Sequence, residues 1–487
     1  MIFKTKPYQH QLETYELTKD KEYFAYLMEM GLGKTKVTID VFNNLYSKNE
    51  VNAILVLAPK SVYMNWYKEF EIHFNQEVYA IAHHSSSLGK KDKNSLNYVI
   101  NSQIPIPKVL LVNTESIRSK KGFTACYDFL KLNRVMMVVD ESTDIKTHNS
   151  KQTVAATNLG TMAKVRRILT GTPISQDPLD LYSQFEFLKQ GIMQSTNFYA
   201  FKYTYANIVK IDLGPGRPSY EKVNGFMNLD QLKRIIKPHC VRILKKDCLD
   251  LPNKIYSVRE LELSAEQKAY YNQLKELAII MHEKGELTVQ SALETMNKLH
   301  QITCGHLKLD NGEIIRFKDN NKLKEINRIT KELDNESKVI IWCNYQEDVR
   351  ILHEEIKQSV TYYGPNTIEQ RQNAIKDFQE GEAKYFISTQ QCGGKGITLT
   401  AAQYAIYYSN GYRLLDRLQS EDRHHRIGQT KQCHYTDLVI KDTICERVKQ
   451  SIQKKGNDAE EFLSSMKSIK TITDKIEENP AELLKII

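Results

Sequence analysis

Residues 23–35 read Tyr-Phe-Ala-Tyr-Leu-Met-Glu-Met-Gly-Leu-Gly-Lys-Thr, and this stretch decides the fold class. Residues 23–28 are apolar or aromatic and predict a buried strand, although periodicity alone does not exclude a helix of that length. Residues 37–42, Val-Thr-Ile-Asp-Val-Phe, predict the first turns of a helix. A strand, a glycine turn, a Lys-Thr pair and a helix, in this order, are typical of a loop that binds the phosphates of a nucleotide.

Each residue type in this loop has a chemical reason to be there. Gly31 and Gly33 let the backbone approach a phosphate, Lys34 reaches the β- and γ-phosphates, and Thr35 holds Mg²⁺. The pattern predicts ATP and Mg²⁺ as cofactors. It departs from the general phosphate loop at Met28, where a glycine is usual. A glycine turn before an ordinary helix is therefore the alternative for this motif taken alone.

Length and composition are those of a globular protein of several domains. The chain has 487 residues, of which 41% are hydrophobic and 26% charged, enough for about two to four domains. It contains no apolar run of about eighteen residues that would span a membrane, and residues 1–11 lack a signal-peptide core. The formal charge of +9 favours a polyanionic partner.

Cysteine and histidine spacing does not predict a metal site. The eight cysteines form no CxxC pair, which argues against a zinc ribbon and fits a reducing compartment. The pairs His83-His84 and His424-His425 have no further partners at the spacing that metal ligands use.

Gln9 lies upstream of the predicted phosphate loop. Its amide offers one donor and one acceptor, the pair needed to recognise an adenine edge. Position and chemistry together predict that Gln9 contacts the base of the nucleotide, whereas Gln9 alone would be an ordinary polar surface residue.

Polar residues follow two further predicted strands. Lys60-Ser61 come after the apolar residues 53–59, and Asn113-Thr114 come after residues 109–112. Ligands of parallel sheets bind beyond the carboxyl ends of the strands, so these side chains are predicted to contact nucleic-acid phosphates. Ordinary capping of a helix N-terminus is the alternative for each of them.

Asp140 and Glu141 directly follow the apolar residues 135–139. A strand that ends in two adjacent carboxylates suits a Mg²⁺-nucleotide site: Asp140 would bind the metal, and Glu141 would orient or deprotonate the attacking water. A simple acidic turn is the alternative. A further strand, residues 165–169, ends in Thr170-Gly171-Thr172-Pro173.

The second half of the chain predicts another α/β unit. Apolar stretches at residues 338–342, 360–363, 384–388 and 404–408 predict strands, and residues 368–378 predict a helix. Thr389, Gly394 and Gly396 follow one of these strands, where glycines beside hydroxyls permit contact with a DNA phosphate. A glycine-rich turn without a ligand is the alternative.

Four motifs in this order resemble the Snf2 family of superfamily 2 ATPases, which move along double-stranded DNA. They are MGLGKT, VVDES, LTGTPISQDPLDLYSQFEFL and QSEDRHHRIGQ, and the resemblance extends from about Tyr8 to Val448. It implies an α/β fold of two tandem RecA-like lobes with parallel sheets and helical insertions. The implied limits are 1–252 for the first lobe with an insertion at about 188–250, 253–453 for the second with an insertion at about 264–310, and 454–487 for a charged helical tail.

The resemblance also implies roles for residues of the last motif. Arg423 and Arg426, which would point the same way if they lay on one helix, would cross the cleft between the lobes and stabilise charge on the γ-phosphate. Gln419 would contact the nucleotide. With Lys34, Asp140 and Glu141, the two arginines complete the expected catalytic set.

The implied function is an ATP-dependent DNA translocase in replication, recombination, repair or protein displacement. Its partners would be double-stranded DNA, bound through the phosphate backbone, and replication or recombination proteins. The motor unit is expected to be a monomer in the cytoplasm of a bacterium or a phage-infected cell. The alternatives are a superfamily 2 helicase that separates DNA or RNA strands and a nucleotide-gated DNA-binding module with little turnover.

Two residues depart from the family pattern. Thr143 stands where the acidic motif usually has a histidine that links the ATP site to neighbouring motifs. Met28 stands where an aspartate is usual. Neither change removes a group that the hydrolysis chemistry requires.

Overall fold

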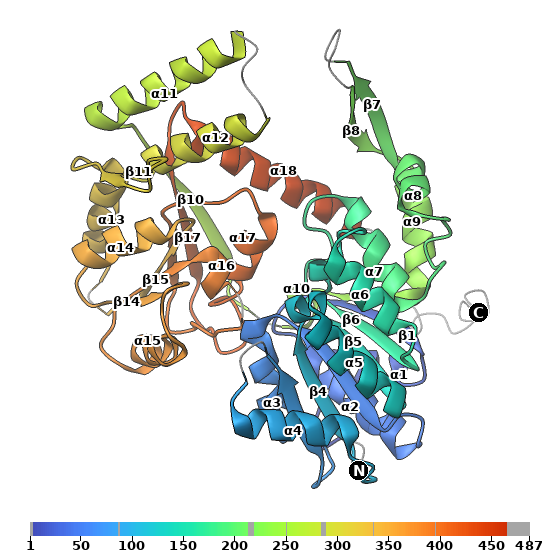
Figure 1. Ribbon diagram of the computed structural model, residues 1–487. Helices are drawn as coiled ribbons and strands as arrows, with labels where there is room; N and C mark the ends of the chain where they lie inside the picture. The colour runs from blue at the N-terminus through green and yellow to red at the C-terminus, as the bar shows by residue number, and fades with distance from the viewer. Residues whose placement is uncertain are drawn as a thin grey trace, which may run out of the picture. The chain divides into compact units, whose positions relative to one another are not determined.

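The computed structural model describes residues 3–85, 88–212, 219–249, 251–283, 289–334, 336–394 and 396–464. The chain forms two compact units, Met1–Asp250 with Asn457–Ile487, and Leu251–Gly456 (Figure 1). The sequence analysis places the boundary between the lobes after residue 252, and this division places it after Asp250. The sequence analysis also treats residues 454–487 as a separate tail, whereas this division assigns Asn457–Ile487 to the first unit. In the described part of that segment, Phe462 is 2% exposed and packs in the core of the first unit.

The first unit is built on a parallel sheet of seven strands in the order β3-β4-β2-β5-β6-β1-β9. The strands predicted at residues 23–28, 53–58, 109–112, 135–139 and 165–169 are confirmed, whereas β3 and β9 were not predicted. The strands are β1 (Tyr23–Met28), β2 (Ala53–Ala58), β3 (Ala80–His84), β4 (Lys108–Asn113), β5 (Val135–Asp140), β6 (Val165–Leu169) and β9 (Cys240–Ile243).

Both faces of this sheet are covered, which explains why its strands are continuous apolar runs. Along β5, Met137 and Val139 pack in one core and Met136 and Val138 in the other. The second of these cores contains the helices α1 (Gln9–Thr18), α2 (Lys34–Ser47) and α3 (Lys60–His73). The first contains α4 (Lys90–Asn101), α5 (Lys120–Leu132), α6 (Lys151–Gly160) and α7 (Leu181–Leu188).

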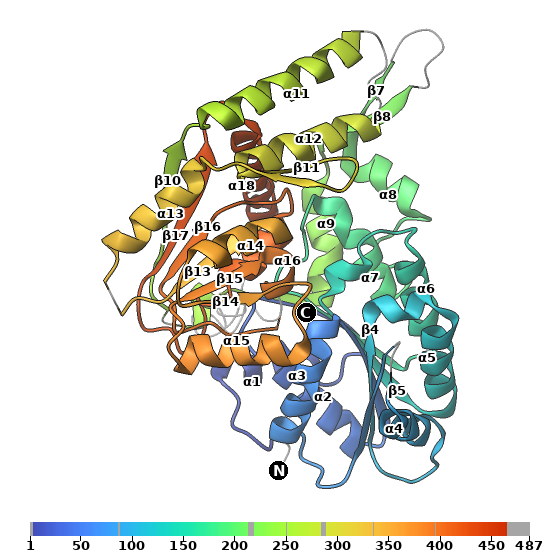
Figure 2. The ribbon, with the colours of Figure 1, turned by 60° about the vertical axis from the view of Figure 1, so that its left-hand side comes forward.

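The insertion predicted to be helical at about residues 188–250 is mixed, so that part of the prediction was wrong. Between α8 (Phe198–Tyr205) and α9 (Leu229–Ile236), the strands β7 (Ala206–Ile211) and β8 (Tyr220–Phe226) pair antiparallel and project beyond the helices (Figures 1 and 2). β9 then joins the main sheet beside β1, and the short helix α10 (Lys245–Cys248) follows. Within this insertion, residues 212–219 form a polar stretch rich in glycine and proline, predicted from the sequence to be a loop, and residues 213–218 of it lie outside the described residues.

The second unit contains a parallel sheet of six strands in the order β10-β17-β16-β13-β15-β14. The four strands predicted here and the helix at residues 368–378 are confirmed, whereas β10 and β17, which pair over eight residues, were not predicted. The strands are β10 (Lys254–Leu261), β13 (Val339–Cys343), β14 (Ser359–Tyr362), β15 (Tyr385–Thr389), β16 (Tyr404–Tyr407) and β17 (Cys433–Ile440).

Helices also cover both faces of this second sheet, and α13 (Asn321–Glu332) and α14 (Gln346–Glu355) pack on the face opposite α15 (Ile368–Glu380). The insertion expected at residues 264–310 begins as two helices, α11 (Ala265–Glu283) and α12 (Val289–Thr303), which lie side by side in Figures 1 and 2. A small hairpin follows, β11 (His306–Lys308) with β12 (Ile314–Arg316). The remaining helices are α16 (Gln390–Gly393), α17 (Leu414–Glu421) and α18 (Ile444–Ser464).

The predicted fold class, α/β with two parallel sheets, is confirmed. Among the described residues, no helix is both long and apolar enough to cross a membrane.

Candidate nucleotide-binding site

The predicted phosphate loop connects β1 to α2. Gly31 and Gly33 have φ angles of 84° and 79°, in the left-handed region that residues with a Cβ rarely adopt. A Cβ on Gly33 would also lie 2.2 Å from Nε2 of Gln11. The φ angle is the constraint that requires glycine at this position, and a side chain here would also displace the Gln11 amide. The helix begins at the next residue, Lys34, so the loop presents backbone N–H groups and the positive end of a helix to a bound anion.

Lys34 is held close to the backbone of its own loop. Its Nζ donates to the carbonyl oxygens of Met28 at 2.9 Å and Glu29 at 3.3 Å. Met28, which replaces the usual residue, therefore contributes only its backbone to this contact. The Lys34 ammonium is also close enough to influence the carboxylate of Asp140.

Gln9 and Gln11 lie on the same helix but have different surroundings. Gln9 is exposed at the start of α1, and its amide donates to Glu13 at 2.8 Å. Gln11 is 4% exposed and donates to the Leu32 carbonyl in the phosphate loop at 3.2 Å, beside a second donor, His10, at 3.0 Å. The role of Gln9 in recognising adenine remains a prediction. The support that Gln11 gives to the loop was not predicted.

Asp140 and Glu141 end β5 and are both buried, with 6% and 8% of their surface exposed. Burial raises the pKa of Asp140, and the opposing influences are a hydrogen bond from Trp66, the charge of Lys34 and the Glu141 amide. The Trp66 indole N–H donates to Oδ2 of Asp140 at 2.9 Å, while the amide of Glu141 donates to Oδ1 at 3.0 Å. A buried carboxylate in these surroundings is stabilised by a cation, so the site fits a Mg²⁺-nucleotide.

The backbone of Glu141 is strained. Its φ of 55° lies in the left-handed region, which costs a non-glycine residue of order 1–3 kcal/mol. The next residue, Ser142, is fully buried and donates to Oε1 of Gln184 at 2.7 Å. Nε2 of Gln184 donates to the carbonyls of Pro173 at 2.8 Å and Asp180 at 2.7 Å. Gln184 thus ties the turn that carries Glu141 to the turn after β6.

Ser142→Ala is expected to lower the free energy of unfolding by about 1–3 kcal/mol, because it leaves the buried Oε1 of Gln184 without its donor. Urea unfolding of both proteins measures this loss. Ser183→Ala is the matched control, because Ser183 is 3% exposed and its hydroxyl makes no hydrogen bond within the described part of the chain. Equal losses in the two variants would contradict the structural role of the Ser142–Gln184 bond.

The predicted phosphate contacts of the first unit lie at the carboxyl edge of the sheet, where β2 and β4 are neighbours. Lys60 is exposed at the start of α3, which also contains Ser61. Asn113 caps the short 3₁₀-helix Thr114–Arg118 by accepting from the Glu115 amide at 3.3 Å, which is the capping alternative. The Thr114 side chain is fully buried and has no surface to offer a phosphate in this structure.

Arg423 and Arg426 lie in the turn that follows α17, not on a helix, so the reason given for their common direction was wrong. They are nevertheless brought together, because Nη1 of each donates to the Ile397 carbonyl, at 3.2 Å and 3.3 Å. Nε of Arg423 also donates at 2.9 Å to the carbonyl of Gln419, which is 1% exposed on α17. Tertiary contacts with residue 397 therefore orient the pair.

Thr389, Gly394 and Gly396 lie just after β15. Thr389 is 7% exposed at the N-terminus of α16. A Cβ on Gly394 would lie 2.4 Å from the Gln390 carbonyl, and Gly396 has a φ of 74°. The local backbone therefore explains why both residues are glycine without any ligand, and their contact with DNA stays a prediction.

Sequence comparison identifies both halves of the chain. The model of the SNF2-related domain matches residues 25–309, and that of the helicase conserved C-terminal domain matches residues 321–428. The chain is 28% identical over 433 residues to the uncharacterized ATP-dependent helicase MG018 of Mycoplasma genitalium, with 87% of this chain and 38% of that protein covered. It is 25% identical over 454 residues to the putative ATP-dependent helicase/translocase YwqA of Bacillus subtilis, with 90% and 46% covered. The chain thus spans less than half the length of these relatives.

Among solved structures, the chain is similar to the SWI2/SNF2 ATPase core of Sulfolobus solfataricus in complex with dsDNA. The identity is 24%, 94% of each chain is covered, and the TM-score is 0.41.

Proposed function

This chain belongs to the family defined by the SNF2-related domain, and on that premise we propose that it is an ATP-driven motor that moves along double-stranded DNA. The observation that carries the proposal is the arrangement around Lys34. A lysine at the N-terminus of a helix is near a buried carboxylate pair, Asp140 and Glu141, at the carboxyl end of the same sheet.

The phosphate loop is proposed to hold the triphosphate of ATP. The backbone around Gly31 and Gly33 would surround the phosphates, and Lys34 would exchange its carbonyl partners for phosphate oxygens. Thr35 and Asp140 would hold Mg²⁺, which when bound neutralises charge on the phosphates. Gln9 and Gln419 are proposed to contact the nucleotide.

Glu141 is proposed to orient and deprotonate the attacking water. Its carboxylate must be placed to within a fraction of an ångström to do so, and two contacts serve that need. Trp66 fixes Asp140 next to it, and the Ser142–Gln184 bond fixes the strained turn that follows. Arg423 and Arg426 of the second unit would stabilise charge on the γ-phosphate, as an arginine finger does.

Double-stranded DNA is proposed as the track. The formal charge of +9 favours a polyanion, and two relatives in the matched set carry the names probable ATP-dependent DNA helicase CHR23, from Arabidopsis thaliana, and helicase/translocase YwqA. Contacts to the phosphate backbone would give binding with little sequence preference. The proposed contacts are Lys60, Ser61, Asn113, Thr389, Gly394 and Gly396, whereas the buried Thr114 is left out of the proposal.

The biological setting follows as part of the proposal. A monomeric motor that moves on duplex DNA would serve replication, recombination, repair or the displacement of proteins, together with partners from those processes.

Duplex DNA is expected to stimulate steady-state ATP hydrolysis, and the stimulation should grow with duplex length because a longer track allows more steps per encounter. The measurement compares no nucleic acid, duplex DNA, single-stranded DNA and RNA at fixed salt, since phosphate contacts depend strongly on ionic strength. A displacement assay with a DNA triplex then detects movement.

The other outcomes identify other functions. Stimulation mainly by single strands, with separation of a duplex, would indicate a strand-separating helicase. Nucleotide binding without turnover under any of these conditions would indicate a nucleotide-gated binding module.

A further inference from the structure

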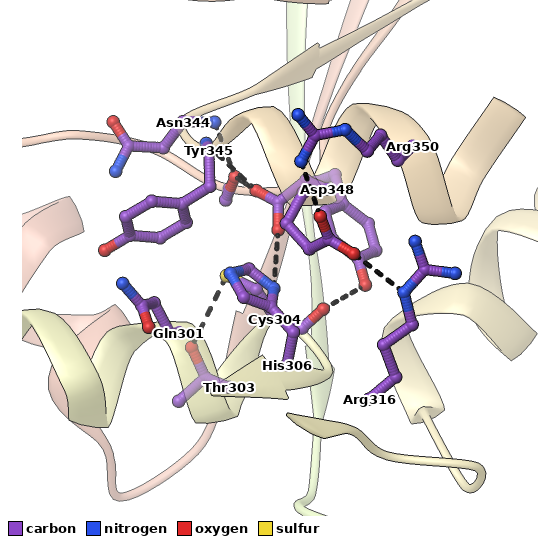
Figure 3. Close-up of polar contacts among 12 residues, drawn as sticks. Gln301, Thr303, Cys304, His306, Arg316, Asn344, Tyr345, Asp348 and Arg350 are labelled. Carbon is purple, nitrogen blue, oxygen red and sulfur yellow. Dashed lines mark hydrogen bonds and ion pairs between the residues drawn. The ribbon is translucent and has the colours of Figure 1, made fainter. Parts of the chain in front are cut away.

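A buried polar cluster lies in the second unit, where the end of α12, the start of α14 and the strand end after β16 meet. Figure 3 shows Asp348 at its centre, with His306 and Tyr345 beside it. Asp348 is fully buried, and its carboxylate lies 3.3 Å from His306 and accepts from the Tyr345 amide at 3.2 Å and the Ser409 hydroxyl at 2.5 Å. Both hydrogen bonds are accepted by Oδ2 of Asp348, whereas its Oδ1 faces the His306 ring.

Lys322 lies close to this cluster and is 1% exposed, in the first turn of α13. Its Nζ donates to the Tyr408 carbonyl at 2.8 Å and lies 3.7 Å from Sγ of Cys445. No carboxylate in the described ranges forms an ion pair with it. A buried ammonium without a counter-charge costs several kcal/mol. Burial lowers the pKa of Lys322, but the nearby Cys445, Cys304 and Asp348 outweigh that effect and raise it, and of these three Cys445 is the group in contact with Nζ.

Cys445 has the surroundings of a thiolate. It is 6% exposed in the first turn of α18, where the helix dipole favours an anion. As a thiol, its Sγ–H donates to the Thr303 hydroxyl oxygen at 3.1 Å, while the Thr303 hydroxyl donates to the His300 carbonyl at 2.6 Å. Burial raises the pKa of its thiol, but Lys322 and then His300 outweigh that effect and lower the pKa to about 5. The structure therefore places the Lys322 ammonium beside the Cys445 sulfur in the first turns of two helices, and the lowered pKa of the thiol favours the thiolate.

The other buried cysteines are different. Cys126 lies in the apolar core of the first unit, where burial raises the pKa of its thiol to about 12. Cys304, next to Thr303, is also held well above its usual pKa, by burial and by the charge of Asp348. Thiolate chemistry is thus confined to Cys445 among these three.

We propose that Cys445 is an oxidation site, at which a peroxide generates a sulfenic acid that then joins Lys322 through a sulfenamide bond. In the first step the thiolate attacks hydrogen peroxide, an S–O bond forms, the O–O bond breaks and hydroxide leaves. Hydroxide takes one proton from the Lys322 ammonium, the amine attacks sulfur, and the S–O bond breaks as water leaves with the second proton. The net reaction of thiolate, ammonium and peroxide yields the crosslink and two waters, with sulfur oxidised and peroxide reduced.

The space next to the pair limits the rate of this reaction. A cavity of about 10 Å³, the size of one water, is lined by both residues together with His300, Asn410 and Lys449. A peroxide enters only when side chains move, so the reaction is expected to be slow. The product would fix α13 to α18 and remove both buried charges, and a thiol would reverse it.

The test exposes the full chain to hydrogen peroxide, digests it without reductant and maps the peptides by mass spectrometry. The expected product is a peptide pair joined through Lys322 and Cys445, lighter by two hydrogen atoms than the separate peptides and released by dithiothreitol. Cys126, equally buried but without a cation, should stay reduced in the same sample. A reduced Cys445, or a disulfide between Cys445 and Cys304, would overturn the proposal.

Two variants separate the charge pair from general packing. Cys445→Glu keeps an anion beside Lys322, whereas Cys445→Ala leaves the buried ammonium without one. The Cys445→Glu protein should therefore have the higher melting temperature. Lys322→Met should lose the crosslink and, because it also removes the cation that lowers the pKa of the thiol, should leave Cys445 reduced like Cys126. If Lys322→Met does not fold, the ranking of the two Cys445 variants still decides, and a Cys445→Glu protein less stable than Cys445→Ala would refute the buried ion pair.

Discussion

Glu141→Gln is expected to reduce ATP hydrolysis by about 10²–10⁴-fold, the usual contribution of a general base, while ATP binding is retained. The change is isosteric and removes only the negative charge and the capacity to accept a proton. The strained turn persists, because the Asp144 amide still donates to the Glu141 carbonyl at 2.9 Å and the Ser142–Gln184 bond is untouched. Single-turnover hydrolysis and equilibrium binding of a fluorescent ATP analogue measure the two effects separately.

A suitable control is Glu16→Gln, which makes the same chemical change on an exposed residue of α1 and should leave both quantities unaltered. Unimpaired hydrolysis in the Glu141→Gln protein would remove Glu141 from the catalytic set. An equal loss of binding and hydrolysis would assign it to nucleotide binding instead.

Lys34→Ala is expected to weaken ATP binding by about 10²–10⁴-fold and to abolish turnover. The estimate takes two hydrogen bonds from the ammonium to phosphate oxygens at about 1.5–3 kcal/mol each. The folded protein should tolerate the change, because the bonds that Lys34 donates to Met28 and Glu29 go to backbone carbonyls that can exchange their partner. Isothermal titration with Mg²⁺-ATP measures the affinity, and circular dichroism checks the fold.

Lys48→Ala is the matched control for charge. Lys48 follows the last turn of the same helix, is 46% exposed in its side chain and forms an ion pair with Asp20 at the surface. The Lys48→Ala protein should bind ATP with the affinity of the unaltered protein. A Lys34→Ala protein with normal affinity would contradict the phosphate loop itself, independently of any role in DNA binding.

The sequence predicted correctly the features that depend on a few consecutive residues. The glycine turn before Lys34 and the strand that ends in Asp140 are short contiguous patterns, and the structure has both as predicted. Predictions failed where periodicity was extended across a region of mixed structure. Residues 206–211 and 220–226 pair as a hairpin between two helices, and the prediction that the whole insertion is helical missed it.

Long-range contacts were the least predictable part of the site. Trp66 reaches Asp140 across 74 residues of chain, and Gln184 reaches Ser142 across 42. The support that Gln11 gives to the phosphate loop was not predicted, because which amide of α1 faces the loop depends on how α1 packs against it. Arg423 and Arg426 are oriented alike because both donate to the Ile397 carbonyl, and their spacing in the sequence does not predict this contact.

The sequence by itself determined the fold class, the order of the motifs and the family. These properties depend on apolar runs, glycine positions and motif spacing, all of which are visible in the order of the residues. Only the tertiary structure decided which side chains support Asp140 and Glu141, and that Lys322 has a thiol instead of a carboxylate as its neighbour. The physical reason is that burial and charge pairing are set by residues far apart in sequence, and their energies depend on distances that exist only once the chain has folded.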